Sequence, residues 1–187
     1  VTEFAYDNWL PIAQVRGGST SFTVWGLDLS SAMQGAGGVG GLLATVQDGE
    51  IYFACADANG NVTEYVAANG PVVAHREYDA FGNFVMSAGA KRDEFSHWFS
   101  SKPIDEETEA SDFGYRVYKP AQGRFSSRDP VAERGGPNLY GFVGNNAIIR
   151  FDPLGKTSFD QYIKWRYEVF YHNVGPLSIG DIPGWLG

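Results

Sequence analysis

The most constraining feature of this sequence is a short motif that occurs twice, 22 residues apart. It reads Asp57-Ala-Asn-Gly-Asn61 in the first copy and Asp79-Ala-Phe-Gly-Asn83 in the second. An aspartate that opens a turn accepts a backbone N–H two residues on, and a glycine in the fourth place tolerates a positive φ angle. Both copies are therefore predicted to be hairpin turns. The turn-forming residues are Asp57, Gly60, Asp79 and Gly82.

A single hairpin cannot bury both of its faces, so several of them must pack together into a long, spiralling sheet. The 24 glycines and 9 prolines suit short strands joined by tight turns, and 43% hydrophobic residues are too many for a disordered chain. The alternating segment Ser21-Phe-Thr-Val-Trp25 adds a further strand. The predicted fold class is all-β in the main, with minor helix in the C-terminal region.

Composition excludes several classes of function. Lysine and arginine number 14 against 22 aspartates and glutamates, so the net charge of −8 argues against a nucleic-acid partner. The sequence contains no apolar run long enough for a membrane span. A single cysteine, Cys55, and three scattered histidines lack metal-ligand spacing, so no metal and no cofactor are expected.

Two local patterns partly match the sequence patterns of calcium-binding and phosphate-binding loops. Asp57, Asn59 and Asn61 have the spacing of a calcium loop, but Val62 stands where that loop needs a glycine. The glycine-rich segment 35–41 lacks the Lys-Ser/Thr that completes a phosphate-binding loop. The first pattern is therefore interpreted as a turn, and the second as a close-packed backbone corner between strands.

Several separated motifs resemble a known family. Arg76-Glu-Tyr-Asp-Ala-Phe-Gly-Asn83 is similar to the tyrosine-aspartate (YD) repeat. Three longer stretches resemble the Rhs repeat-associated core domain, in the same order and at the same spacing. They are Gly114 to Pro130, Asn138 to Asn146, and Asp152-Pro-Leu-Gly155. The resemblance covers residues 50–156 well and residues 1–49 less closely.

The resemblance implies a hollow β-shell, as in Rhs proteins, Tc-toxin C components and teneurins, which the core domain closes. It divides the chain into shell strands over 1–92, the core over 93–156 and a variable tail over 157–187. The implied partners are the remainder of the shell and a C-terminal effector, and the implied location is secreted or at the cell surface. Val1 is then expected to continue a longer chain, and unpaired edge strands would favour self-association.

In this family the core cuts the chain by chemistry similar to that of aspartyl proteases. The matching positions are Asp129 and Asp152, with Arg128 as a supporting cation. Two neighbouring carboxylates can divide the roles of base and acid in peptide hydrolysis. The cut would fall in the region of Gly155, Lys156 and Thr157. Each aspartate alone is also a common turn former, so a purely structural role remains an alternative.

Lys156 departs from the family pattern, in which an apolar leucine follows the glycine. A desolvated apolar pocket would accept its ammonium group poorly, which predicts slow cleavage. Two functions therefore remain open: a self-cleaving core that closes a toxin-encapsulating shell, or a structural or adhesive surface module of the same family that does not cleave. A third, glycan binding on exposed tryptophans, is weaker because aromatic residues of sheets usually lie in the core.

Overall fold

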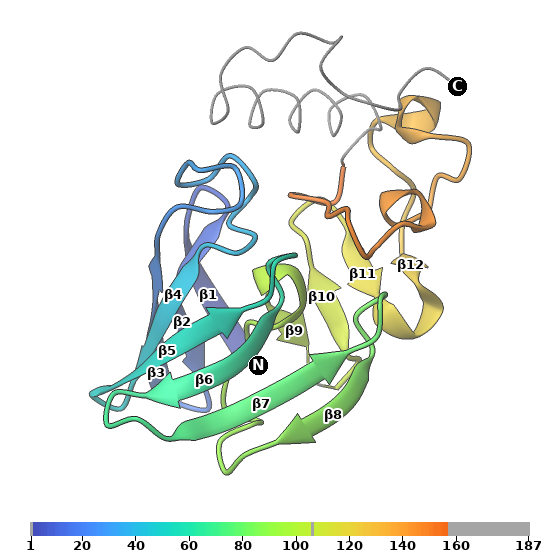
Figure 1. The fold of residues 1–187 in the computed structure, drawn as a ribbon. Coiled ribbons are helices and arrows are strands. Elements are labelled where there is room, and N and C mark those ends of the chain that lie inside the picture. The colour runs from blue at the N-terminus through green and yellow to red at the C-terminus, as the bar shows by residue number, and fades with distance from the viewer. Residues whose placement is uncertain (1, 106, 157–187) are drawn as a thin grey trace, which may run out of the picture.

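The computed structural model describes residues 2–105 and 107–156, and these residues form two antiparallel sheets. The larger sheet has the strand order β1 to β8 (Figure 1). Its strands are β1 (Thr2–Asp7), β2 (Leu10–Arg16), β3 (Ser19–Trp25), β4 (Leu42–Gln47), β5 (Glu50–Ala56), β6 (Val62–Ala67), β7 (Val72–Tyr78) and β8 (Phe84–Ala88). The predicted all-β fold class is confirmed.

The smaller sheet has the order β12-β11-β10-β9. Its strands are β9 (Ile104–Asp105), β10 (Ala110–Asp112), β11 (Val117–Lys119) and β12 (Arg124–Phe125). Helical structure in the described residues is limited to the short 3-10 turns η1 (Phe99–Ser101), η2 (Pro120–Gln122), η3 (Ala132–Gly135) and η4 (Val143–Asn145). None of these turns has the length or apolar character of a membrane-crossing helix. The tail over 157–187, including the predicted helix, lies outside the described residues.

Both repeated motifs form the predicted hairpin turns, one between β5 and β6 and the other between β7 and β8. Asp57 Oδ1 accepts the backbone N–H groups of Asn59 and Asn61, both at 2.9 Å, and Oδ2 accepts the Asn61 amide at 2.8 Å. The same three contacts recur around Asp79 at 2.8, 3.0 and 2.7 Å. The glycines in the fourth place have φ angles of +80° and +88°.

Gly82→Val is expected to destabilise the fold strongly, since two costs combine at this turn. The positive φ of +88° strains any side chain, at about 1–3 kcal/mol. A Cβ atom would also lie 2.7 Å from Cγ of the Phe99 ring. Gly49→Val is the matched control, because Gly49 has φ of +81° and nothing within 4 Å of a Cβ. Urea unfolding should show the larger loss for Gly82→Val, and an unchanged stability would contradict the turn assignment.

The larger sheet curves around the segment that follows β8 (Figure 1). Phe95 and Trp98 of this segment enter the main core, where the Phe95 ring stacks on Tyr65 with centroids 3.8 Å apart. A second core of buried aromatic rings lies around the smaller sheet, and its members are Phe99, Phe113, Tyr118, Phe125 and Phe142. This second core supports the loops that carry the candidate site.

The glycine-rich segment forms the expected close-packed corner between β3 and β4. The buried Asp28 organises it, because its Oδ2 accepts the backbone N–H groups of Ala36 at 2.7 Å and Gly38 at 3.1 Å. A Cβ atom on Gly37 would collide with the carbonyl oxygen of Pro153. The corner therefore packs directly against the Asp-Pro-Leu-Gly motif, 116 positions further along the chain.

Candidate functional site

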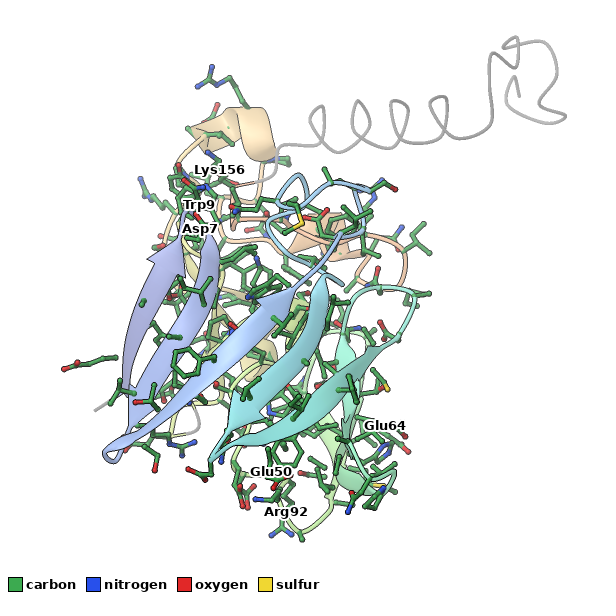
Figure 2. All side chains as sticks on the ribbon, turned by 90° about the vertical axis from the view of Figure 1, so that its left-hand side faces the viewer. Asp7, Trp9, Glu50, Glu64, Arg92 and Lys156 are labelled. Atoms are coloured by element: carbon green, nitrogen blue, oxygen red, sulfur yellow. The ribbon has the colours of Figure 1, made fainter. Side chains whose placement is uncertain are left out.

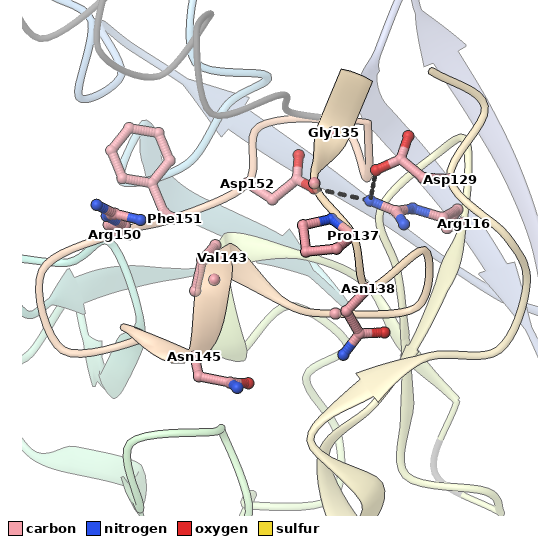
Figure 3. Close-up of a pocket in the computed structure, with 13 residues that line it drawn as sticks. Arg116, Asp129, Gly135, Pro137, Asn138, Val143, Asn145, Arg150, Phe151 and Asp152 are labelled. Atoms are coloured by element: carbon pink, nitrogen blue, oxygen red, sulfur yellow. Dashed lines mark hydrogen bonds and ion pairs between the residues drawn. The ribbon is translucent and has the colours of Figure 1, made fainter. Parts of the chain in front are cut away.

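The structure brings the two motif aspartates together at one guanidinium group. Asp129 follows β12, whereas Asp152 begins the Asp-Pro-Leu-Gly motif. Nη2 of Arg116 lies 3.0 Å from Oδ2 of Asp129 and 3.4 Å from Oδ2 of Asp152 (Figure 3). The three side chains are only 2%, 7% and 3% exposed. Two carboxylates and one cation thus form a buried cluster.

Arg116 also holds the backbone around this cluster. Its Nε donates to the carbonyl oxygen of Gly155, its Nη1 donates to that of Leu139 at 3.3 Å, and its Cζ lies 3.7 Å from the centroid of the Phe125 ring. Burial lowers the pKa of Arg116, and Asp152 and Asp129 oppose this shift. The guanidinium remains charged because its ordinary pKa is so high.

Sequence analysis predicted that Arg128 is the supporting cation, but Arg128 is exposed in the structure. The cation in contact with both aspartates is instead Arg116, which the sequence analysis missed. A signal was available. Arg116 stands two positions before Tyr118, and residues two apart in an extended segment share a face. Because aromatic residues of sheets usually lie in the core, the face that carries Tyr118 is expected to be buried, and Arg116 with it.

The second oxygen of Asp152 fixes the turn that follows it. Asp152 Oδ1 accepts the backbone N–H groups of Leu154 at 3.2 Å, Gly155 at 2.8 Å and Lys156 at 3.2 Å. Gly155 has a φ angle of +71°, and a Cβ there would lie 3.1 Å from the backbone nitrogen of Arg116. The Asp-Pro-Leu-Gly motif is therefore a tight, aspartate-organised turn as well as part of the cluster.

A buried lysine holds the same turn from its other side. Nζ of Lys102 donates to the carbonyl oxygens of Gly37 and Pro153, each at 2.7 Å. Burial lowers the pKa of Lys102 to about 8, while Asp152, Asp112 and Asp28 oppose the shift. No motif in the sequence pointed to Lys102, since its two partners come from segments far away in the chain.

The segment that was predicted to be cut is only partly described. The carbonyl of Leu154 accepts the backbone N–H of Tyr115 at 3.1 Å, and Lys156 is the last residue described. Thr157, and with it the bond after Lys156, lies outside the described residues. Lys156 does not occupy the desolvated apolar pocket that sequence analysis expected. It is partly exposed, and its Nζ lies 4.0 Å from the centroid of the Tyr115 ring.

A cavity of about 520 Å³ adjoins the cluster. Arg116, Asp129 and Asp152 line one part of it, and the loops around η3 and η4 line the rest (Figure 3). This volume is within the range of small-molecule and peptide sites. The arrangement offers two carboxylates and a guanidinium next to a fixed backbone turn. Within the described part of the chain, no three His, Cys, Asp or Glu residues gather as metal ligands.

Comparisons with known proteins find several similar sequences but no matching family model. No model of a known protein family matches the sequence. Salivary gland surface protein 1 of Aedes aegypti is 29% identical over 119 residues, which are 63% of this chain and 3% of that protein. The tRNA3(Ser)-specific nuclease WapA of Bacillus spizizenii is 30% identical over 124 residues, 64% of this chain and 5% of the nuclease. Another toxin protein and toxin subunits also match.

A solved structure has the same fold. The crystal structure of TcdB2-TccC3-Cdc42 matches with a TM-score of 0.66 and 22% identity, over 88% of this chain and 8% of that one. The chain thus spans only a small fraction of the length of each protein that it matches. In sequence it is similar to a toxin protein and a toxin subunit, and its fold is similar to that of the TcdB2-TccC3 complex.

Proposed function

We propose that this chain is the closing part of a secreted, toxin-encapsulating β-shell, and that it cuts its own backbone after Lys156. Residues 1–92 are assigned to the shell wall, residues 93–156 to the closing core, and residues 157–187 to the start of the enclosed region. Its partners are then the rest of the shell and the effector inside. The toxin-type relatives support the shell role.

A single observation carries the proposed cleavage. Asp129 and Asp152 share one nitrogen of Arg116, and the same guanidinium binds the carbonyl of Gly155, one residue before the proposed bond. The pair is therefore fixed relative to the chain that it would cut. Holding the reacting groups in place beforehand lowers the entropic part of the barrier.

The proposed reaction is hydrolysis of the peptide bond between Lys156 and Thr157. One carboxylate takes a proton from water, whose oxygen bonds to the carbonyl carbon of Lys156. The other carboxyl group gives its proton to the departing nitrogen, and the C–N bond breaks. The products are a carboxylate on Lys156 and an amine on Thr157. Arg116 stabilises negative charge at the pair throughout.

Mass spectrometry of the intact chain tests this proposal. Freshly purified protein is incubated, and the fragment ending at Lys156 is followed over time. Asp129→Asn and Asp152→Asn should each slow its formation by about 100-fold or more, because each removes one proton-transfer group. Asp105→Asn is the matched control, since this aspartate is the exposed last residue of β9 and its substitution should leave the rate unchanged. Equal rates in all three variants would contradict the catalytic roles.

The second candidate is a structural or adhesive module that does not cleave. One observation favours it: Asp152 Oδ1 already accepts three backbone N–H groups, so the side chain has a turn-forming task of its own. The relative from Aedes aegypti is, moreover, a surface protein. The same mass measurement decides between the candidates. A wild-type chain that keeps its full mass through prolonged incubation would favour the structural module.

A further inference from the structure

Lys156, the last described residue, lies over one of two packed aromatic rings that come from distant segments. Trp9 lies in the turn between β1 and β2, and Tyr115 lies just before β11. Their ring centroids are 4.9 Å apart with the planes tilted by 36°, and Nζ of Lys156 is 4.0 Å from the Tyr115 centroid. Figure 2 shows Trp9 and Lys156 at the same end of the larger sheet.

The local structure fixes both rings with respect to Lys156. The backbone N–H of Tyr115 donates to the carbonyl of Leu154 at 3.1 Å, so the ring is tied to the segment that carries the lysine. Gly114 has φ of +92°, and a Cβ there would press on the Trp9 ring at 3.2 Å. The close packing of Trp9 against Tyr115 thus depends on a glycine at position 114, directly before Tyr115.

The two packed rings form a partly exposed aromatic surface, and Tyr115 presents its face to the side chain at position 156. Trp9 is 40% exposed and Tyr115 is 43% exposed. The face of an aromatic ring is electronegative and attracts an ammonium or guanidinium group. The methylene stem of a lysine also covers apolar ring surface while its charged end reaches water. An anionic side chain would be repelled, and a short neutral one would leave the rings uncovered.

We propose that Trp9 and Tyr115 form a side-chain subsite that selects a cationic residue at position 156. This inference rests on the proposed function where it concerns cleavage, because it makes the subsite the determinant of the residue after which the chain is cut. Lys156 is then the matched residue for this chain rather than a poor substitute for leucine.

Binding at the subsite is measured by NMR, independently of cleavage. Ring currents of Tyr115 should move the side-chain protons near Nζ of Lys156 upfield from those of the exposed Lys119. Tyr115→Phe keeps a ring and should retain this shift, whereas Tyr115→Leu should abolish it. A wild-type Lys156 signal that coincides with the Lys119 signal would overturn the subsite.

Cleavage is measured on the same proteins by intact mass. Lys156→Gln should slow scission by about two- to fivefold, the loss expected for one exposed cation–π contact. Lys156→Glu should slow it further, and Lys156→Arg should be the fastest of the three substituted chains. Lys119→Gln, which removes a positive charge outside the subsite, should cleave at the wild-type rate. Equal rates for the glutamine, glutamate and arginine variants would overturn the selectivity.

The two readouts separate this inference from the proposed function. Absence of scission in every chain would overturn the proposed cleavage, while an upfield Lys156 signal in the same samples would still support the subsite. Scission together with a Lys156 signal that coincides with the Lys119 signal would support the proposed cleavage and overturn the subsite. Lys156→Leu should cleave more slowly than the wild-type chain. In the Tyr115→Leu background this difference should disappear, because the ring that favours the cation is gone.

Discussion

Arg116→Met is expected to lower the free energy of unfolding by about 3–5 kcal/mol, the usual loss when one partner of a buried ion pair is removed. The arginine is 2% exposed and contacts Asp129 and Asp152, which are themselves buried. Methionine fills much of its volume without its charge. Two carboxylates would then remain in the protein interior without their cation, and Gly155 would lose a donor to its carbonyl.

Two further variants separate charge from packing at Arg116. Arg116→Lys keeps the charge but cannot reproduce the forked contacts, so it should lose a smaller part of the stability. Adding Asp129→Asn and Asp152→Asn to Arg116→Met should recover part of the loss, because neutral amides need no cation and still accept the turn N–H groups. Urea unfolding at neutral pH measures all four proteins. A triple variant as unstable as Arg116→Met would contradict the electrostatic explanation.

Lys102 should make the stability rise with pH in alkaline solution. Burial lowers its pKa to about 8 in the folded chain, against 10.5 for an ordinary lysine. Below pH 8 both states carry the proton, and the folded chain bears the full cost of a buried charge. Between pH 8 and 10.5 the unfolded chain binds more protons than the folded chain. The free energy of unfolding therefore rises by about 1 kcal/mol per pH unit. The neutral amine can still donate to both carbonyls.

The measurement is the difference between wild-type and Lys102→Met unfolding free energies across this pH range. Taking a difference cancels the tyrosines, whose ionisation acts on both proteins. The wild-type curve should rise relative to the variant from pH 8 to 10.5. Lys119→Met, at an exposed lysine, should run parallel to the wild type. Parallel curves for Lys102→Met as well would show that Lys102 keeps an ordinary pKa.

The sequence was most informative where structure is local. Asp57 and Asp79 bind N–H groups two and four residues away, so five consecutive letters specify each turn. Asp129 and Asp152 were paired through the resemblance, since nothing between them in the chain indicates that they meet. Arg116 was overlooked because an arginine in an extended segment is ordinarily solvent-exposed. Lys102 had no signal at all, as its partners are carbonyls whose positions only the tertiary fold decides.

Because each strand from β1 to β8 pairs with its neighbours in the sequence, the larger sheet is modular in an evolutionary sense. Insertion or deletion of a whole hairpin leaves every remaining strand paired with an antiparallel neighbour. Gene duplication can therefore lengthen such a sheet without changing the pairing of its other strands. The aspartate-organised turns carry their own hydrogen bonds within five residues and would travel with each copy. In the proposed shell, the number of hairpins would therefore set the enclosed volume, independently of the residues that form the Arg116 cluster.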